Sequence, residues 1–196
     1  MEVDIISMSW TIEKAEKANA LNDLDTALSK AGGKDILMFC AARDEGLENP
    51  KRRPFPAASG TNKIMIIGAA GPSGAISTWV NAGAIHFLFP GIELREARPE
   101  LMPPEMVTVD GSSTATALAS GLAALLLTIL ATDTSNTWNP KHGRYDKINN
   151  ILTSIQGDKK YVQIWDLFDE YTRDSQTEGD RKVLQKMVDG ILFKAK

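Results

Sequence analysis

The sequence has very few of the side chains that bind metals or form disulfides, with one cysteine and two histidines in 196 residues. A single cysteine excludes a disulfide within the chain, and Cys40 lies in the apolar run 36–42, which predicts a buried structural thiol. His86 and His142 have no neighbouring cysteine and do not share a helix face, so no metal site is predicted. No cofactor is expected either.

The sequence also lacks a surplus of basic charge and an uninterrupted membrane-spanning stretch, and no leader segment is expected. Its net charge of -3 offers nothing to neutralise phosphates, which argues against nucleic acid as a partner. The first residues contain no basic region followed by an apolar one, and the longest apolar run is interrupted by Ser120 and Gly121. We therefore expect a cytoplasmic protein with no membrane partner.

Apolar runs and one amphipathic pattern organise the first 91 residues. Strands are predicted at 3–9, 36–42, 63–70 and 84–89, and Thr11 is predicted to cap a helix that stops at Gly32 and Gly33. A strand, a helix and a strand of these lengths imply a right-handed parallel crossover. These elements predict an α/β fold with a parallel sheet.

The stretch from Val109 to Leu127 is the element around which the rest of the sheet is expected to pack. A turn of small polar residues passes into a run of Ala and Leu, which predicts a helix buried nearly all round. Ser112 and Ser113 fall in its first turn, where unpaired N–H groups and the helix dipole favour developing negative charge. A plain N-cap role for either serine is the alternative.

Beyond about residue 132 the pattern changes to amphipathic helices. Three such patterns are predicted, near 145–156, 161–172 and 180–193, and each has an apolar stripe wide enough for a core contact. We predict a domain over residues 1–132 and a helical extension over residues 133–196.

Three segments that are far apart in the sequence are expected to frame one cleft. Ser9 follows the first strand, Asp44 follows the second, and Ser113 opens the central helix. Because carboxyl ends of parallel strands and helix amino termini meet at one edge of such a sheet, these residues are expected to converge. The glycine-rich segment 68–74 lacks the spacing of a dinucleotide loop, so a Rossmann-like binding protein is only the third interpretation.

The order of these segments resembles the C-terminal half of the catalytic domain of the subtilisin-like serine proteases, the subtilases (peptidase S8/S53 domain). Ile6-Ser7-Met8-Ser9-Trp10 is similar to the family's Asn-Met-Ser-Leu-Gly segment, and Ala41-Ala42-Arg43-Asp44-Glu45-Gly46 to its Ala-Ala-Gly-Asn-Glu-Gly. Phe55-Pro56-Ala57, Ile67-Gly68-Ala69 and Phe89-Pro90-Gly91 resemble its Tyr-Pro-Ala, Val-Gly-Ala and Ala-Pro-Gly. Gly111-Ser112-Ser113-Thr114-Ala115 resembles its Gly-Thr-Ser-Met-Ala nucleophile motif. The resemblance spans residues 3–130.

This resemblance implies a subtilisin-like sheet and a serine-type endopeptidase, a hydrolase that cleaves polypeptides. Ser113 then matches the nucleophile and Asp44 the oxyanion-hole position. The residues matched to substrate binding are Ser9, Trp10, Thr11, Ala41 and Ala42.

The departures from the family pattern are as informative as the matches. Asp44 replaces an amide donor, and its ionised carboxylate would repel an oxyanion; Arg43 and Thr11 stand where the family has glycines, and Trp10 is unusually bulky. The family's catalytic aspartate and histidine lie upstream of its first matched segment, and neither His86 nor His142 matches the base. Breaking such a triad costs about ten-thousand-fold or more in rate.

We therefore expect a domain fragment that is inactive alone because its triad is incomplete, with a longer gene product supplying the missing aspartate and histidine. The alternative is a degenerate, non-catalytic interaction module that has kept the subtilase fold.

Overall fold

The computed structural model describes residues 3–12, 19–44, 54–98, 105–131, 142–157 and 159–168, together with 186, 189–191 and 193. Its main sheet has four parallel strands in the order β1-β2-β3-β4. The strands are β1 (Ile5–Met8), β2 (Leu37–Ala41), β3 (Ile64–Ala70) and β4 (Phe87–Pro90). Every residue of β2 and β3 is buried, because both faces of the sheet are covered.

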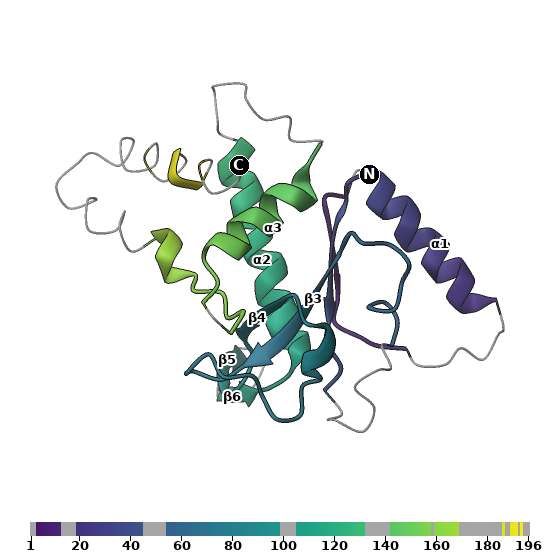
Figure 1. Cartoon of the computed structure of the whole chain (residues 1–196). Helices are drawn as coiled ribbons and strands as arrows, with labels where there is room; N and C mark the ends of the chain where they lie inside the picture. The colour runs from purple at the N-terminus through teal and green to yellow at the C-terminus, as the bar shows by residue number, and fades with distance from the viewer. Residues whose placement is uncertain are drawn as a thin grey trace.

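Helices cover the two faces of this sheet. α1 (Ala20–Gly33) lies on one side, and α2 (Ser112–Ala131) with α3 (Arg144–Ser154) on the other (Figure 1). α2 contacts all four strands. By length and composition α2 could cross a membrane, with a mean hydropathy of 1.9, but half of that stretch is buried inside the fold, as in a core helix. The predicted α/β fold with a parallel sheet and a central helix is confirmed.

Two element boundaries differ from the prediction. Thr11 does not cap α1: Ile12 instead pairs with Phe55 through backbone hydrogen bonds of 2.8 and 2.9 Å, and α1 starts at Ala20. Residues 13–18, which the predicted helix included, lie outside the described residues. β4 starts at Phe87 rather than at residue 84, because Ala84 ends a short 3-10 helix, η1 (Ala82–Ala84), and residues 85 and 86 link that helix to the strand.

A small antiparallel hairpin follows β4, where no element was predicted. It consists of β5 (Leu94–Arg98) and β6 (Glu105–Val109). The run Val107-Thr108-Val109 is typical of a strand, so β-branched composition was the signal that could have identified it.

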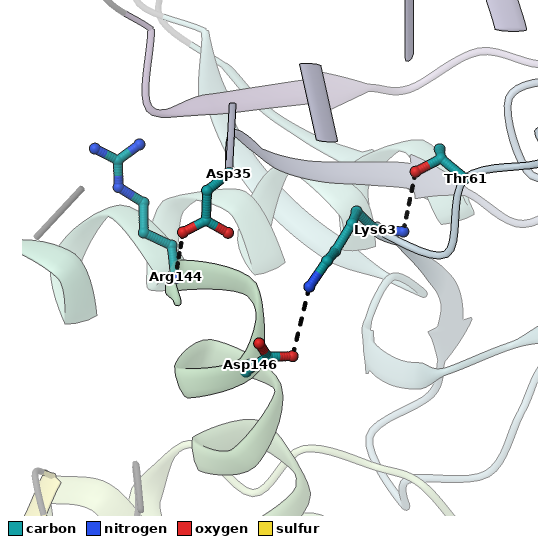
Figure 2. Close-up of polar contacts among 5 residues, drawn as sticks. All are labelled: Asp35, Thr61, Lys63, Arg144 and Asp146. Carbon is teal, nitrogen blue, oxygen red and sulfur yellow. Dashed lines mark hydrogen bonds and ion pairs between the residues drawn. The ribbon is translucent and has the colours of Figure 1, made fainter. Parts of the chain in front are cut away.

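The segment after α2 packs against the amino edge of the sheet. The backbone N–H of Arg144, the first residue of α3, donates to Asp35 Oδ2 at 2.7 Å, and Lys63 Nζ lies 3.6 Å from Asp146 (Figure 2). The Arg144 guanidinium lies 2.9 Å from a carboxylate oxygen of Asp4, just before β1. These contacts fasten α3 to the ends of three strands, and Ile148, Ile151 and Leu152 of α3 are buried.

The remaining described tail follows the predictions in part. Helical residues are found at 165–168 and at 186, 189–191 and 193, but Tyr161 and Val162 form β-bridges instead of opening a helix. Leu88 of β4 exchanges hydrogen bonds with Lys160 O and Val162 N, at 2.8 and 2.9 Å. The domain boundary at residue 132 stays a prediction, since residues 132–141 lie outside the described part of the chain.

Candidate active site at the carboxyl edge of the sheet

The carboxyl ends of the strands meet the first turn of α2, as expected from the parallel topology. Ser9, after β1, donates its hydroxyl to the backbone oxygen of Ser113 at 3.1 Å. Asp44, after β2, accepts a hydrogen bond from the Ser112 N–H at 2.8 Å. Gly91, after β4, accepts one from the Gly111 N–H at 2.8 Å. The structure thus brings Ser9, Asp44 and Ser113 to one place.

The two adjacent serines have different surroundings. Ser112 is fully buried, and its hydroxyl oxygen accepts a hydrogen bond from the Ala69 N–H of β3 at 3.2 Å. Ser113 is partly exposed, and its hydroxyl has no hydrogen-bond partner among the described residues. Ser112 therefore holds the helix to the sheet, while Ser113 presents an accessible hydroxyl.

Two glycines permit this close approach of strand and helix. Gly111 has a φ of +139°, and a Cβ there would lie 3.0 Å from Ser113 Oγ and 3.5 Å from Asp44 Oδ2. A Cβ on Gly91 would lie 2.7 Å from the Ala69 Cβ and 2.9 Å from the Gly111 carbonyl oxygen. Both positions therefore exclude side chains, and the Ser113 hydroxyl and the Asp44 carboxylate lie on the same side of Gly111, around the place that a Cβ would take.

Asp44 lies at the amino end of α2, where its carboxyl group accepts the Ser112 N–H while the residue stays exposed to solvent. A carboxylate is stabilised there by the partial positive charge of the helix terminus and by the unpaired first-turn N–H groups. Burial raises the pKa of the Asp44 carboxyl above its ordinary value of 3.8, and the hydrogen bonds from Ser112 oppose that shift. The Asp44 carboxylate thus uses one of the donors that a helix amino terminus offers to a bound anion.

The residues matched to substrate binding divide into an exposed and a buried group. Ser9, Trp10 and Thr11 are exposed, and the Trp10 side chain keeps 42% of its surface accessible. Ala41 and Ala42 are buried, so their side chains are not available to a ligand. The role of these five residues in binding stays a prediction.

Arg43 is held by its backbone to the loop that precedes η1. Its carbonyl oxygen accepts a hydrogen bond from the Asn81 N–H at 3.0 Å, and Asn81 caps η1 through the Gly83 N–H. This contact positions the strand end from which Asp44 projects.

An open groove of about 540 Å³ lies beside Ser113, between α2 and the hairpin. Leu94 and Arg95 of β5, which the sequence analysis missed, line it on the hairpin side together with Val109 of β6. Thr114, Ala117 and Leu118 of α2 form the inner wall with Ser113. The groove was missed because the hairpin itself was not predicted.

Both histidines of the sequence lie at the opposite edge of the sheet. His86 precedes β4 and is exposed; its Nδ1 accepts a hydrogen bond from the Ile66 N–H at 3.2 Å. His86 and Gly91 are five positions apart along extended chain, a span of roughly 16 Å. His142 stands two residues before Arg144, which is tied to Asp35 and Asp4 at the amino edge. Neither histidine is placed to accept a proton from Ser113.

The described residues contain no group of three or more His, Cys, Asp or Glu side chains that could hold a metal ion. Cys40 is buried in β2, and burial raises the pKa of its thiol to about 12. At neutral pH this thiol is therefore protonated and is a poor nucleophile.

An α/β domain with an accessible serine at the amino end of a central helix defines the class of this protein. The chain belongs to the subtilase family: the family model of the subtilases (peptidase S8) matches residues 1–160, which includes α3. A search of curated proteins found no match.

Solved structures with the same fold were found as well. The chain resembles a mutant of the protease domain of PatA, with a TM-score of 0.64 and 19% identity over 95% of this chain and 60% of that one. It resembles the prenylagaramide maturation protease PagA, with a TM-score of 0.62 and 23% identity over 83% of this chain and 60% of that one. It also resembles the PatG macrocyclase in complex with peptide, with a TM-score of 0.61 and 17% identity over 94% of this chain and 51% of that one. The chain thus spans about half to three fifths of the length of these proteins.

Proposed function

We propose that this chain is the nucleophile-bearing part of a subtilase catalytic domain, a serine endopeptidase that cleaves polypeptides through Ser113. The observation that carries the proposal is the accessible Ser113 hydroxyl at the amino end of α2, beside Ser9 and Asp44. In the proposed reaction Ser113 Oγ attacks a peptide carbonyl carbon, a base takes the hydroxyl proton, and the carbonyl oxygen becomes an oxyanion at the helix terminus. The leaving amine then takes that proton, and water releases the acyl group.

The catalytic base that takes the Ser113 proton is proposed to come from a segment outside the described residues of this chain. Both histidines of the sequence stand at the amino edge of the sheet, away from Ser113. We therefore propose that a second subtilase segment, on the same gene product or on a separate chain, supplies the catalytic histidine and aspartate. Without it, the expected rate is lower by about ten-thousand-fold or more.

The substrate is proposed to lie along the exposed segment 9–11. Ser9 ties that segment to the first turn of α2, so a peptide bound there would have its scissile bond close to Ser113. A complex of the PatG macrocyclase with peptide supports polypeptide as the class of ligand for this fold.

A fluorophosphonate probe tests the proposal, because an activated serine oxygen attacks its phosphorus and displaces fluoride. The tagged chain is labelled both as the purified chain alone and in extracts of the cells that produce it. We expect labelling at Ser113 in the extract, none in the purified chain, and loss of labelling in Ser113→Ala. Thr114→Ala, which removes the neighbouring hydroxyl in the same groove, is the control that should stay labelled.

The alternative, a non-catalytic interaction module, rests on the Asp44 carboxylate at the position where the oxyanion would form. It predicts that Ser113 is unlabelled under every condition. Labelling of the purified chain alone would instead contradict the proposal that the base comes from elsewhere.

A further inference from the structure

A second pocket lies on the flank of β4 and shares no residue with the groove beside Ser113. Its volume is about 290 Å³, which is close to the lower limit for small-molecule sites. The lining combines apolar side chains with two cations: Ile76, Ala82, Ile85, Leu88, Lys159 and Lys160. None of these lining residues is acidic, so the pocket is both apolar and positively charged.

The apolar floor of the pocket is set by the sheet. Ile85 and Leu88 are buried at the start and in the middle of β4. Ile76 is half-buried and forms a β-bridge with Ala70, the last residue of β3. Ala82 of η1 is exposed at the edge of the pocket. The floor therefore has a fixed shape and offers apolar surface that a hydrophobic group can cover.

The two lysines belong to a segment that is fastened to the outer edge of β4 (Figure 1). Leu88 exchanges backbone hydrogen bonds with the Lys160 oxygen and the Val162 N–H, at 2.8 and 2.9 Å. The Lys160 N–H donates in turn to the Gly157 oxygen at 2.9 Å. The backbone that carries both lysines is therefore held at the pocket without help from a ligand.

Close packing of an aromatic ring on a glycine joins the two sides of the pocket. Gly74, in the loop that leads to Ile76, has a φ of +74°, and a Cβ there would lie 2.9 Å from Cδ1 of Tyr161. Tyr161 directly follows the two lysines. The loop and the lysine segment thus contact each other, and the pocket between them is preformed.

The ammonium of Lys160 is anchored but keeps donors for a ligand. Its Nζ donates to the Ile85 carbonyl oxygen at 2.7 Å, which uses one of the three N–H groups of the ammonium. Lys159 is exposed beside it. Within the described part of the chain, neither lysine forms an ion pair with an acidic side chain. Two positive charges therefore border an apolar floor with no carboxylate of the chain between them.

We propose that this pocket binds the C-terminal residue of a polypeptide, with an apolar side chain on the floor and the α-carboxylate between Lys159 and Lys160. A carboxylate joined directly to an apolar group matches both halves of the pocket. Each ammonium then donates a charge-assisted hydrogen bond, and the side chain covers the floor. The inference goes beyond the proposed protease activity, because no residue of this pocket belongs to the site at Ser113.

The openness of the pocket favours a polypeptide end over other anions. Ala82, Lys159 and Lys160 are all exposed, so a chain whose last side chain is bound can continue into solvent. A free phosphate would contact the lysines but leave the apolar floor uncovered. A long fatty acid would extend beyond a pocket of this volume and leave apolar surface in water.

Fluorescence anisotropy with the purified full chain tests the proposal. The probe is a fluorescein-labelled hexapeptide, Gly-Ser-Gly-Ser-Ala-Leu, with either a free C-terminal carboxylate or a C-terminal amide. We expect the carboxylate form to bind and the amide to bind about tenfold more weakly or less, because the amide lacks the charge. The same peptide ending in glycine should also lose about tenfold, since it has no side chain to bury.

Charge-matched variants locate the binding site. Lys159→Gln combined with Lys160→Gln should reduce the affinity for the carboxylate form to that of the amide, while glutamine at 160 keeps a donor for Ile85. Lys30→Gln combined with Lys34→Gln removes the same charge from exposed lysines at the end of α1, on the other face of the sheet, and should leave binding unchanged.

A change of shape gives an independent test. Ala82→Trp places a large ring in the pocket and should abolish binding of the carboxylate peptide. Because Ala82 is exposed, the thermal unfolding of this variant should stay close to that of the parent chain. Full binding by a folded Ala82→Trp variant would contradict the location of the site.

Several outcomes would overturn the proposal. These are equal affinity for the acid and the amide, an equal effect of the two double variants, and competition by inorganic phosphate as strong as that by unlabelled peptide. Binding of octanoate without binding of the peptide would assign the pocket to free organic acids instead. Ser113→Ala should bind the peptide as the parent does, so this result and the labelling of Ser113 can fail separately.

Discussion

The two edges of the parallel sheet both carry aspartates, but they use them differently. At the amino edge, Asp35 accepts from the Arg144 backbone N–H (Figure 2). Asp4 meets the Arg144 guanidinium at the same edge. At the carboxyl edge, Asp44 faces the amino terminus of α2 and accepts from the Ser112 N–H. The amino edge uses charge to fasten a helix, whereas the carboxyl edge places a carboxyl group at the helix terminus, where the proposed reaction would form its oxyanion.

This difference teaches why a helix amino terminus is not automatically an oxyanion hole. The donors that stabilise a developing anion also stabilise a resident carboxylate, so the two compete for the same partial positive charge. Asp44 is that resident carboxylate. The comparison can be tested by the same change of charge at each edge.

Asp44→Asn should have the largest effect. In the labelling of extracts described above, we expect it to raise the rate at Ser113 by roughly a hundredfold, because it replaces a repelling carboxylate with an amide donor; losing such a donor costs about a hundred- to a thousandfold in subtilisin. Asp35→Asn, the same substitution at the amino edge, is the control and should leave the rate unchanged. Equal effects of the two variants would contradict the distinction between the edges.

Gly91→Ala should be the most destabilising of the single changes at the carboxyl edge. Its Cβ would meet the Ala69 Cβ at 2.7 Å and a backbone oxygen at 2.9 Å, and we expect a loss of about 3 kcal/mol in the free energy of unfolding. Gly121→Ala, in open space on α2, should instead raise stability by about 0.5–1 kcal/mol. Urea unfolding measures the stability change of each variant. If both variants lost stability, or both gained it, the packing argument would be contradicted.

Asp35→Ala should lower the free energy of unfolding by about 2 kcal/mol. About half comes from the lost hydrogen bond that caps α3, and about half from the strain of placing alanine at a φ of 56°. Asp35→Asn keeps an oxygen acceptor and tolerates that backbone conformation, so it should recover most of the loss. Thermal unfolding of the two variants is the measurement. An Asn variant as unstable as the Ala variant would show that charge, and not the hydrogen bond, holds α3.

The smallest expected effect is the dependence of stability on pH through Asp44. Because burial raises the pKa of this carboxyl above 3.8, its contribution favours the folded state below that pH and is lost as the pH rises through the raised pKa. Asp25 has the opposite sign: hydrogen bonds from Ser59 and Gly60 lower its pKa, so its contribution is lost as the pH falls. The free energy of unfolding of the parent chain minus that of Asp44→Asn isolates the contribution of Asp44. We expect this difference to fall as the pH rises, so that the parent chain becomes less stable relative to the variant.

Much of the fold was predictable because its signals are local. Apolar runs identify the buried strands, and the uncharged stretch from Ser112 to Ala131 identifies the central helix. Thr11 misled the prediction because a good capping residue precedes an amphipathic pattern, while the actual chain pairs Ile12 with Phe55, 43 residues away in the sequence. Such pairings are decided by tertiary contacts that no local pattern reports.

The candidate site was predictable in its members but not in their arrangement. Order and spacing pointed to Ser9, Asp44 and Ser113, and the structure brings these three together. The difference between Ser112 and Ser113 needed the fold, because only the position of β3 shows which hydroxyl is buried. The groove wall formed by the hairpin and the exposure of Ala117 and Leu118 also needed it.

The sequence by itself determined the parallel sheet and the serine at the helix terminus, because both depend on residue order and local periodicity. Its motifs also carried the resemblance to the family, which the family model confirms. Only the tertiary structure decided that Asp44 sits on the helix amino terminus and that both histidines stand at the far edge. It alone decided that one face of an uncharged helix is left open. The physical reason is that exposure and distance are properties of packed elements, which a one-dimensional pattern does not contain.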